Sequence, residues 1–254
     1  MTSTAKLPMS DAPPSPVPKP THLSPLALQA ITKNLRTAYS TLFRTFYNRS
    51  PDTSFLRLAD IGTLVSLADQ YCSLPHVAGT VELLLMVWAR CHGRIHEQPI
   101  EVLLLANKIR SKILYNESFV HSVGRLDDYW GRKDELPPEV LAAVVEGYYK
   151  LTGFRTKVDR EVAMIAVIHE GELSIFERNQ LAEVFQRSRK DGEAELYRGI
   201  ERIMSKKSRY RGSALMRNLQ FLLGNELKID NAIYAHLTCT QLEDQYPWND
   251  AEDW

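Results

Sequence analysis

The 254-residue chain is predicted to be all-α, a multi-helix bundle with a disordered N-terminal tail, on two observations. Apolar residues recur at separations of three, four and seven along most of the chain, which is the spacing of one face of an α-helix. Hardly any stretch alternates between apolar and polar residues, as half-buried strands do. We therefore expect a single helical domain over residues 26–242, a disordered tail over 1–25 and an acidic, aromatic tail over 243–254.

The N-terminal tail is rich in Pro, Ser, Ala and Thr and carries few large apolar side chains. It cannot bury enough surface to offset the entropy lost on ordering. It also lacks the continuous apolar run of a secretory signal. The longest mainly apolar run in the chain, residues 81–89, is far shorter than the roughly 20 residues that span a bilayer. We expect an intracellular protein, cytoplasmic or nuclear, that makes no membrane contact.

Breaks in the apolar pattern divide the first half of the chain into five helices. The first follows Pro25, carries its apolar side chains on or near one face, and ends before the Ser50-Pro51-Asp52 break. The residues assigned to that face are Leu26, Leu28, Ile31, Leu35, Tyr39, Leu42, Phe43 and Phe46. The next helices are expected at about residues 53–71, capped by Asp52, at about 76–91, from Pro99 onward, and at about 111–123.

The second half begins with a charged connection at residues 127–135, which is expected to be exposed. Pro137 and Pro138 then start a helix that Gly153 is expected to end. Ser174 and Glu177 have the spacing of a capping box, in which each side chain bonds the backbone N–H of the other residue. Helices are expected at about 157–169, 175–189, 193–204 and 212–223, with a further helical segment at 231–242.

Three segments carry a resemblance to a known family. They are residues 64–79 (LVSLADQYCSLPHVAG), residues 103–124 (LLLANKIRSKILYNESFVHSVG), and the C-terminal Tyr246-Pro247-Trp248 with Asp253-Trp254. They resemble the helical region that follows the BTB/POZ domain in a large group of fungal BTB proteins. In the second segment the matching residues are Ala106, Arg110, Ser111, His121 and Gly124. The resemblance implies an all-helical, BACK-like module for interaction or support, without known catalytic residues.

A BTB domain itself is not recognisable in this sequence. Such a domain has about 100 residues, an ordinary domain size, and in the family it precedes the first of these segments. Here only about 27 structured-looking residues lie between Pro25 and Asp52, ahead of the helix that contains that segment, and they have the pattern of one helix without the strands of a BTB fold. The family roles of the BTB domain, dimerisation and recruitment of cullin-3 ubiquitin ligases, therefore cannot be assigned to residues of this chain. Whether a BTB module was lost or lies outside this sequence stays open.

The sequence contains no motif that predicts catalysis. A Gly-rich phosphate loop, a G-x-S-x-G elbow and a G-x-G-x-x-G fingerprint are all missing. Cys91, His92 and His96 are metal-type ligands, but they lie where a helix ends and are expected to form a solvated turn. His121 lies in an apolar stripe, where a histidine more often donates a hydrogen bond to a neighbouring helix than acts as a base. We therefore expect a non-enzymatic protein without cofactor or metal.

Two places remain as candidate binding sites. Basic residues interleaved with an aromatic one can contact a phosphate or nucleic acid, although a solvated loop is the competing interpretation. This cluster comprises Lys206, Lys207, Arg209, Tyr210 and Arg211. At the C-terminus, aromatic rings among acidic residues can dock onto a partner, and the alternative is that Trp248 folds onto the protein's own helices. The candidate partner-binding residues are Tyr246, Trp248, Asp253 and Trp254.

The balanced charge bears on the choice between these sites. The chain has 31 basic and 31 acidic residues, so it has no overall field that would steer nucleic acid toward it. The leading hypothesis is a protein–protein interaction or scaffold protein related to fungal BTB proteins, with a partner and an oligomeric state that the sequence does not identify. A nucleic-acid-associated factor that uses the basic cluster is the second hypothesis.

Overall fold

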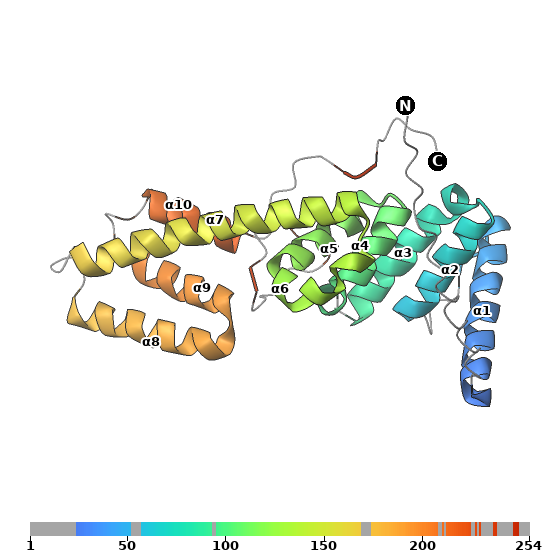
Figure 1. Ribbon diagram of the computed structural model, residues 1–254, viewed down its shortest axis with the longest axis horizontal. Helices are drawn as coiled ribbons and strands as arrows, with labels where there is room; N and C mark the ends of the chain where they lie inside the picture. Colours follow the sequence, from blue (N-terminus) through green and yellow to red (C-terminus); the bar gives the residue numbers. More distant parts are fainter. Residues whose placement is uncertain are drawn as a thin grey trace, which may run out of the picture.

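The computed structural model of the chain describes residues 24–51, 57–92, 95–168, 174–207, 210, 212–224, 227, 229, 236–237 and 246–248. All regular elements of this described part are helical, which confirms the predicted all-α fold (Figure 1). The α-helices are α1 (Pro25–Phe46), α2 (Leu58–Gln70), α3 (Leu74–His92), α4 (Pro99–Lys108), α5 (Lys112–Gly124), α6 (Leu126–Tyr129), α7 (Pro138–Ile168), α8 (Ile175–Asp191), α9 (Glu193–Met204) and α10 (Ala214–Leu223). Two 3-10 helices, η1 (Ile95–Glu97) and η2 (Trp130–Glu135), connect them.

The long helix α7 joins two groups of helices in an elongated molecule (Figure 1). Its first half lies against α5 and α6, and its second half lies against α10, which packs in turn on α9. Helix α1 lies at one end of the molecule and packs against α2 and α3, whereas α8 lies at the other end and packs on α9. One continuous cluster of buried apolar side chains runs through both groups. The two groups therefore share one core.

Residues 64–79 and residues 103–124, which we call the first and second family-like segments, each contain the same kind of corner between two helices. Cys72 and Arg110 follow the ends of α2 and α4 with φ angles of +51° and +54°, in the left-handed region. In each case the next residue is a serine whose N–H reaches back to a carbonyl of the finished helix, Ser73 to Ala68 at 2.7 Å and Ser111 to Ala106 at 3.0 Å. This is the Schellman arrangement, usually built with glycine. The next helix begins directly after that serine.

Some local capping signals were predicted correctly. Pro99 is the first residue of α4, as expected. Ser111 was expected only as the approximate start of a helix, and it caps α5 by accepting the N–H of Leu114 at 3.4 Å. The predicted capping box is also present, since the Ser174 N–H donates to Glu177 at 2.8 Å and the Glu177 N–H donates to Ser174 at 3.3 Å. These features depend on residues three or four apart, so the sequence contains all the information they need.

Two predictions about helix ends were wrong. Helix α7 passes through Gly153 without a break, although a helix end was expected there. Glycine in a helix costs about 1 kcal/mol relative to alanine, and burial of apolar side chains on both sides of Gly153, including Leu151 and Val158, outweighs that cost. Helix α2 begins at Leu58 and not near residue 53, because Arg57 is extended and its N–H donates to the Asp60 carboxylate at 3.2 Å. The expected cap Asp52 lies outside the described residues.

Two connecting segments form short helices. Residues 127–135 are mostly exposed, as expected, and form most of α6 and the 3-10 helix η2. The expected turn around His96 is the 3-10 helix η1, whose Ile95 is buried. Of the helical segment expected at 231–242 the structure describes only His236 and Leu237, and neither is helical. The N-terminal tail up to residue 23 lies outside the described part of the chain.

Candidate functional site

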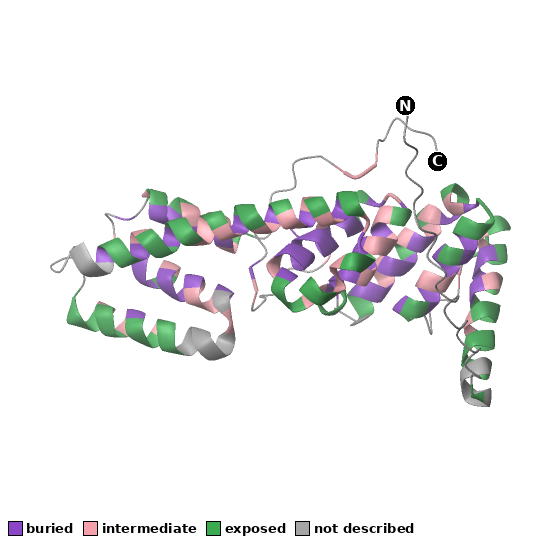
Figure 2. Cartoon of the chain, in the orientation of Figure 1, coloured by how far each residue is buried: buried purple, intermediate pink, exposed green. Residues whose placement is uncertain are grey.

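Helix α5 contains residues 112–124 of the second family-like segment. It is buried over most of its length (Figure 2). Its inward face includes Leu114 and Val123, which are fully buried. Three of its side chains also form hydrogen bonds with residues more than 100 positions away in the sequence. Those residues, which we call the strap residues, are Leu227, Ile229, His236, Leu237, Tyr246 and Trp248. Tyr246 and Trp248, two of the candidate docking residues, therefore lie at a seam between α5 and the other strap residues.

The aromatic strap residues cover the first turns of α5. The Trp248 ring stands perpendicular to the buried Tyr115 ring, with centroids 5.2 Å apart, and the Tyr246 ring stacks on Trp248 at 5.1 Å. Asn116 donates a hydrogen bond to the Tyr246 hydroxyl at 3.2 Å, and the Lys112 ammonium lies 5.1 Å from the Tyr246 ring centre. Of the two interpretations left open for Trp248, the structure has the one in which the ring folds onto the protein's own helix. The candidate docking residues Asp253 and Trp254 lie outside the described residues.

A buried carboxylate holds the middle of the seam. Glu117 is almost fully buried in α5, and its Oε1 accepts the backbone N–H of Ile229 at 2.9 Å. One turn further, Val120 packs against Leu227 in a small apolar cluster. Glu117 therefore holds the backbone of the strap residue Ile229 against α5.

A histidine pair holds the end of the seam. His121 is fully buried, and its Nδ1 lies 3.0 Å from Nε2 of His236, while the His96 ring lies 6.1 Å from the His121 ring. Burial, reinforced by these neighbouring histidines and Arg125, lowers the pKa of His121 to about 3. Burial and Arg125 likewise lower the pKa of His236 to about 4. Both rings are neutral at pH 7, so the N–H of one ring donates a hydrogen bond to the unprotonated nitrogen of the other.

Gly124 lets the strap reach this end of α5. A Cβ atom at residue 124 would overlap the carbonyl oxygen of Leu237 and lie 2.9 Å from Cδ2 of His236. Only glycine leaves room for this approach. The His-Ser-Val-Gly end of the family-like segment therefore has a structural explanation, in which His121 bonds the strap and Gly124 makes space for it one turn later.

The described residues contain no group of three side chains placed to hold a metal ion. Cys91 is exposed, and the side chain of His92 lies outside the described part of the chain. His96, which was assigned to a solvated turn, instead sits half-buried against His121. This arrangement favours a packing role for His96 over a ligand role.

The basic cluster expected near residues 206–211 is only partly at the surface. The Lys207 ammonium lies 2.9 Å from the Glu177 carboxylate. This ion pair, together with the hydrogen bonds from Ser174 to the same carboxylate, lowers the pKa of Glu177 to about 2. Lys206 is exposed, but Tyr210 is buried in the core cluster, so its ring cannot stack on a base as expected. Arg209 and Arg211 lie outside the described residues.

The described part of helix α1 is largely exposed (Figure 2). Among its exposed residues is a stripe of apolar side chains that belong to the apolar face expected from the sequence. Only Ala38, Thr41 and Leu42 of its described side chains are buried against the rest of the protein. The α1 stripe consists of Ile31, Leu35, Tyr39, Phe43 and Phe46, of which four are exposed and Tyr39 is half-buried. Phe43 retains 55% of its accessible surface. This stripe is a second candidate site.

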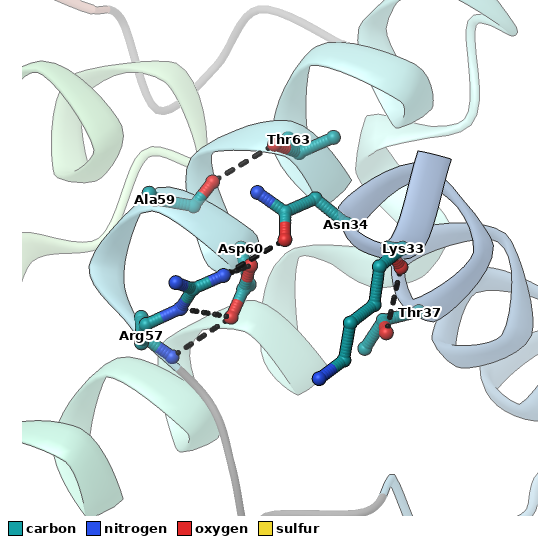
Figure 3. A network of polar contacts seen from close by, with 7 residues as sticks. All are labelled: Lys33, Asn34, Thr37, Arg57, Ala59, Asp60 and Thr63. Atoms are coloured by element: carbon teal, nitrogen blue, oxygen red, sulfur yellow. Dashed lines mark hydrogen bonds and ion pairs between the residues drawn. The ribbon is translucent and has the colours of Figure 1, made fainter. Parts of the chain in front are cut away.

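A polar network fixes the orientation of α1 (Figure 3). The Arg57 guanidinium, at the start of α2, donates to the Asn34 amide oxygen at 2.8 Å and to the Asp60 carboxylate at 3.1 Å. Asp60 is buried, so this ion pair is shielded from water on one side. The network and the buried residues of α1 together hold the stripe facing outward.

Comparisons of the chain with models of protein families, with curated proteins and with solved structures find no match. None of the helices in the described part of the chain is long and apolar enough to cross a membrane.

Proposed function

We propose that this chain is a non-enzymatic helical interaction or scaffold protein of the cytoplasm or nucleus, related to the helical post-BTB region of fungal BTB proteins. The observation that carries the proposal is the exposed apolar stripe on α1. Monomeric soluble proteins rarely expose large contiguous apolar patches, and those that occur often mark sites of interaction with other macromolecules.

The polar residues of α5 support the non-enzymatic part of the proposal. Asn116, Glu117 and His121 are polar residues of α5, and each forms a hydrogen bond with a strap residue. A general base needs a pKa near the working pH and access to a substrate proton. His121 has neither, because it is fully buried and its pKa is about 3. The segment is thus explained by packing alone.

The second hypothesis, a nucleic-acid-associated factor, gains no support from the described residues of its cluster. Binding to backbone phosphates requires several accessible cations, and stacking requires an accessible ring. Lys207 is engaged with Glu177 and Tyr210 is buried. The described residues therefore favour the proposal of a protein-interaction role over the nucleic-acid hypothesis.

Affinity purification of the full chain under gentle conditions tests the proposal. We expect one or more proteins to co-purify reproducibly, compared with a tag-only control and measured by quantitative mass spectrometry. The purified chain should not convert any member of a broad panel of small molecules. Recovery of no reproducible protein partner, together with turnover of a small molecule, would contradict the proposal.

A further inference from the structure

We infer that the α1 stripe binds an amphipathic α-helix of a partner protein whose polar flank is acidic. This inference rests on the proposed function, that the chain binds other proteins, and adds the surface and the chemistry of the partner. It follows from the shape, the composition and the charge of α1.

The shape of the stripe fits a helix. Successive members from Ile31 to Phe46 are separated by four, four, four and three residues, so they form one row along α1. At a rise of about 1.5 Å per residue this row is roughly 22 Å long, or about four turns. A second helix laid alongside can present apolar residues at matching intervals, the usual mode of helix recognition.

The composition of the stripe is that of an interface centre. The Tyr39 ring stacks near Phe43 at 6.5 Å and meets the edge of the Tyr71 ring at 6.4 Å, and the two tyrosine hydroxyls lie 3.2 Å apart. Tyr71 is exposed at the end of α2, so the aromatic row continues from α1 onto the neighbouring helix. Large aromatic side chains dominate the energetics of many interfaces.

The helix that carries the stripe has charged side chains of one sign only. Residues 24–51 contain no aspartate or glutamate, but contain Lys33, Arg36, Arg44 and Arg49, and all four are exposed. Arg36 lies seven residues before Phe43, which places both on one side of the helix. The closest carboxylates along α2 are already engaged, Asp60 with Arg57 and Asp69 with Lys108. An acidic flank on the partner would complement this field and speed association.

Other occupants fit the charge less well. A second copy of α1 would bring two sets of positive side chains together, which is unfavourable across an interface. The chain's own residues 1–23 contain Lys6, Lys19 and only one acidic residue, Asp11. The acidic C-terminal segment has the right charge, but its Tyr246 and Trp248 rings are already packed on α5. A separate acidic helix is the remaining occupant.

Binding of a designed peptide to the full chain tests the inference. The probe is a fluorescent helical peptide of about 18 residues, with leucines at i, i+3, i+4 and i+7 spacing and glutamates on the flanks. We expect fluorescence anisotropy to give a Kd on the order of 10 μM or tighter. A peptide of the same composition with scrambled order, and one with lysine in place of glutamate, should each bind at least about tenfold more weakly.

Paired variants locate the binding on α1. Phe43→Ser with Phe46→Ser, and separately Arg36→Glu with Arg44→Glu, should each weaken binding of the acidic peptide at least about tenfold. The matched controls are Tyr149→Ser with Phe176→Ser, which changes two exposed aromatics on α7 and α8, and Arg160→Glu with Arg217→Glu on α7 and α10. These control variants should bind the peptide like the wild type.

Three outcomes would overturn the inference. One is absence of binding to the acidic peptide, and another is equal binding by the α1 variants and the wild type. The third is a concentration-dependent dimer, seen by analytical ultracentrifugation, that the Phe43 and Phe46 substitutions abolish, because a second copy would then occupy the stripe. None of these outcomes contradicts the proposed function, which fails if purification recovers no reproducible protein partner and the purified chain turns over a small molecule.

Discussion

The rings of His121 and His236 meet at 3.0 Å although the two residues lie 115 positions apart in the chain. His121 belongs to the last turn of α5, and His236 belongs to the strap residues that cover that helix. The hydrogen bond between the two rings forms when both imidazoles are neutral or when one of them is charged. A charged imidazole would lie buried beside Arg125, and burial strongly disfavours that charged form. The contact that closes the seam is therefore also the contact most sensitive to acid.

This pair predicts that the protein loses stability between pH 7.5 and pH 5. The pKa of His121 is about 3 in the folded protein against 6.5 for an unperturbed histidine, so the unfolded state binds more protons over that interval. The contribution of neutral His121 to the free energy of unfolding is fully present above pH 6.5 and falls as the pH is lowered toward 3. At pH 5 the loss from His121 alone is about 2 kcal/mol. Urea unfolding at the two pH values measures it.

His236→Gln and His76→Gln serve as the paired variants for this prediction. Glutamine at 236 can still hydrogen-bond but does not titrate, so the loss of stability between pH 7.5 and 5 should become smaller. His76 is exposed on α3, and its replacement should leave the loss unchanged. An equal pH dependence in wild type and His236→Gln would mean that the pair does not govern acid sensitivity.

Gly124→Ala should destabilise the seam, whereas Gly153→Ala should stabilise the protein. A methyl group at 124 would overlap the Leu237 carbonyl, and forced repacking of this kind costs about 1–3 kcal/mol. At Gly153, inside α7, a Cβ would meet no atom within 4 Å, so alanine should add about 0.5–1 kcal/mol of stability. Thermal unfolding of both variants checks the two signs. Hydrogen exchange should also increase at Leu237 in Gly124→Ala only.

The sequence was sufficient wherever structure depends on close neighbours. The start of α4 at Pro99 and the capping box of Ser174 and Glu177 were predicted because their signals lie within one turn. The apolar surroundings of His121 likewise predicted a structural role. Its partner could not be predicted, because nothing within α5 indicates that residue 236 returns to that helix.

Tertiary packing decided the features that the sequence left open or assigned wrongly. Gly153 looked like a helix end, but contacts on both sides of it keep α7 continuous. The apolar residues of the first helix all fit one broad face, and only packing against α2 and α3 shows that Leu42 is buried while Phe43 is exposed. The α1 stripe was therefore invisible to periodicity. Gly124, one turn after His121, is a local sequence feature that permits a close approach of Leu237 to α5. In the sequence it is noted only as one of the residues that match the family pattern.

Leu114→Ala and Ile113→Ala should differ sharply although the residues are adjacent. Leu114 is fully buried in α5, so removing its side chain leaves a cavity and should cost about 2–5 kcal/mol of unfolding free energy. Ile113 keeps 37% of its surface exposed, and its truncation should cost less than about 1.5 kcal/mol. Denaturant titration at pH 7.5 measures both changes. Similar costs at the two positions would show that the rotational setting of α5 is wrong.

Replacements at Cys72 should move stability in opposite directions according to backbone preference. Cys72 is exposed and has a φ of +51°, a conformation that costs a residue with a Cβ about 1 kcal/mol. Glycine adopts the left-handed conformation freely, so Cys72→Gly should be as stable as the wild type or more stable. The relief of backbone strain is offset in part because glycine gives the unfolded chain more conformational freedom. Valine is β-branched and tolerates this region poorly, so Cys72→Val should lower the free energy of unfolding by about 1–3 kcal/mol. Chemical denaturation under reducing conditions compares the three proteins without interference from thiol oxidation. If valine proved as stable as glycine, the corner between α2 and α3 would not contain the left-handed residue that its hydrogen bonds require.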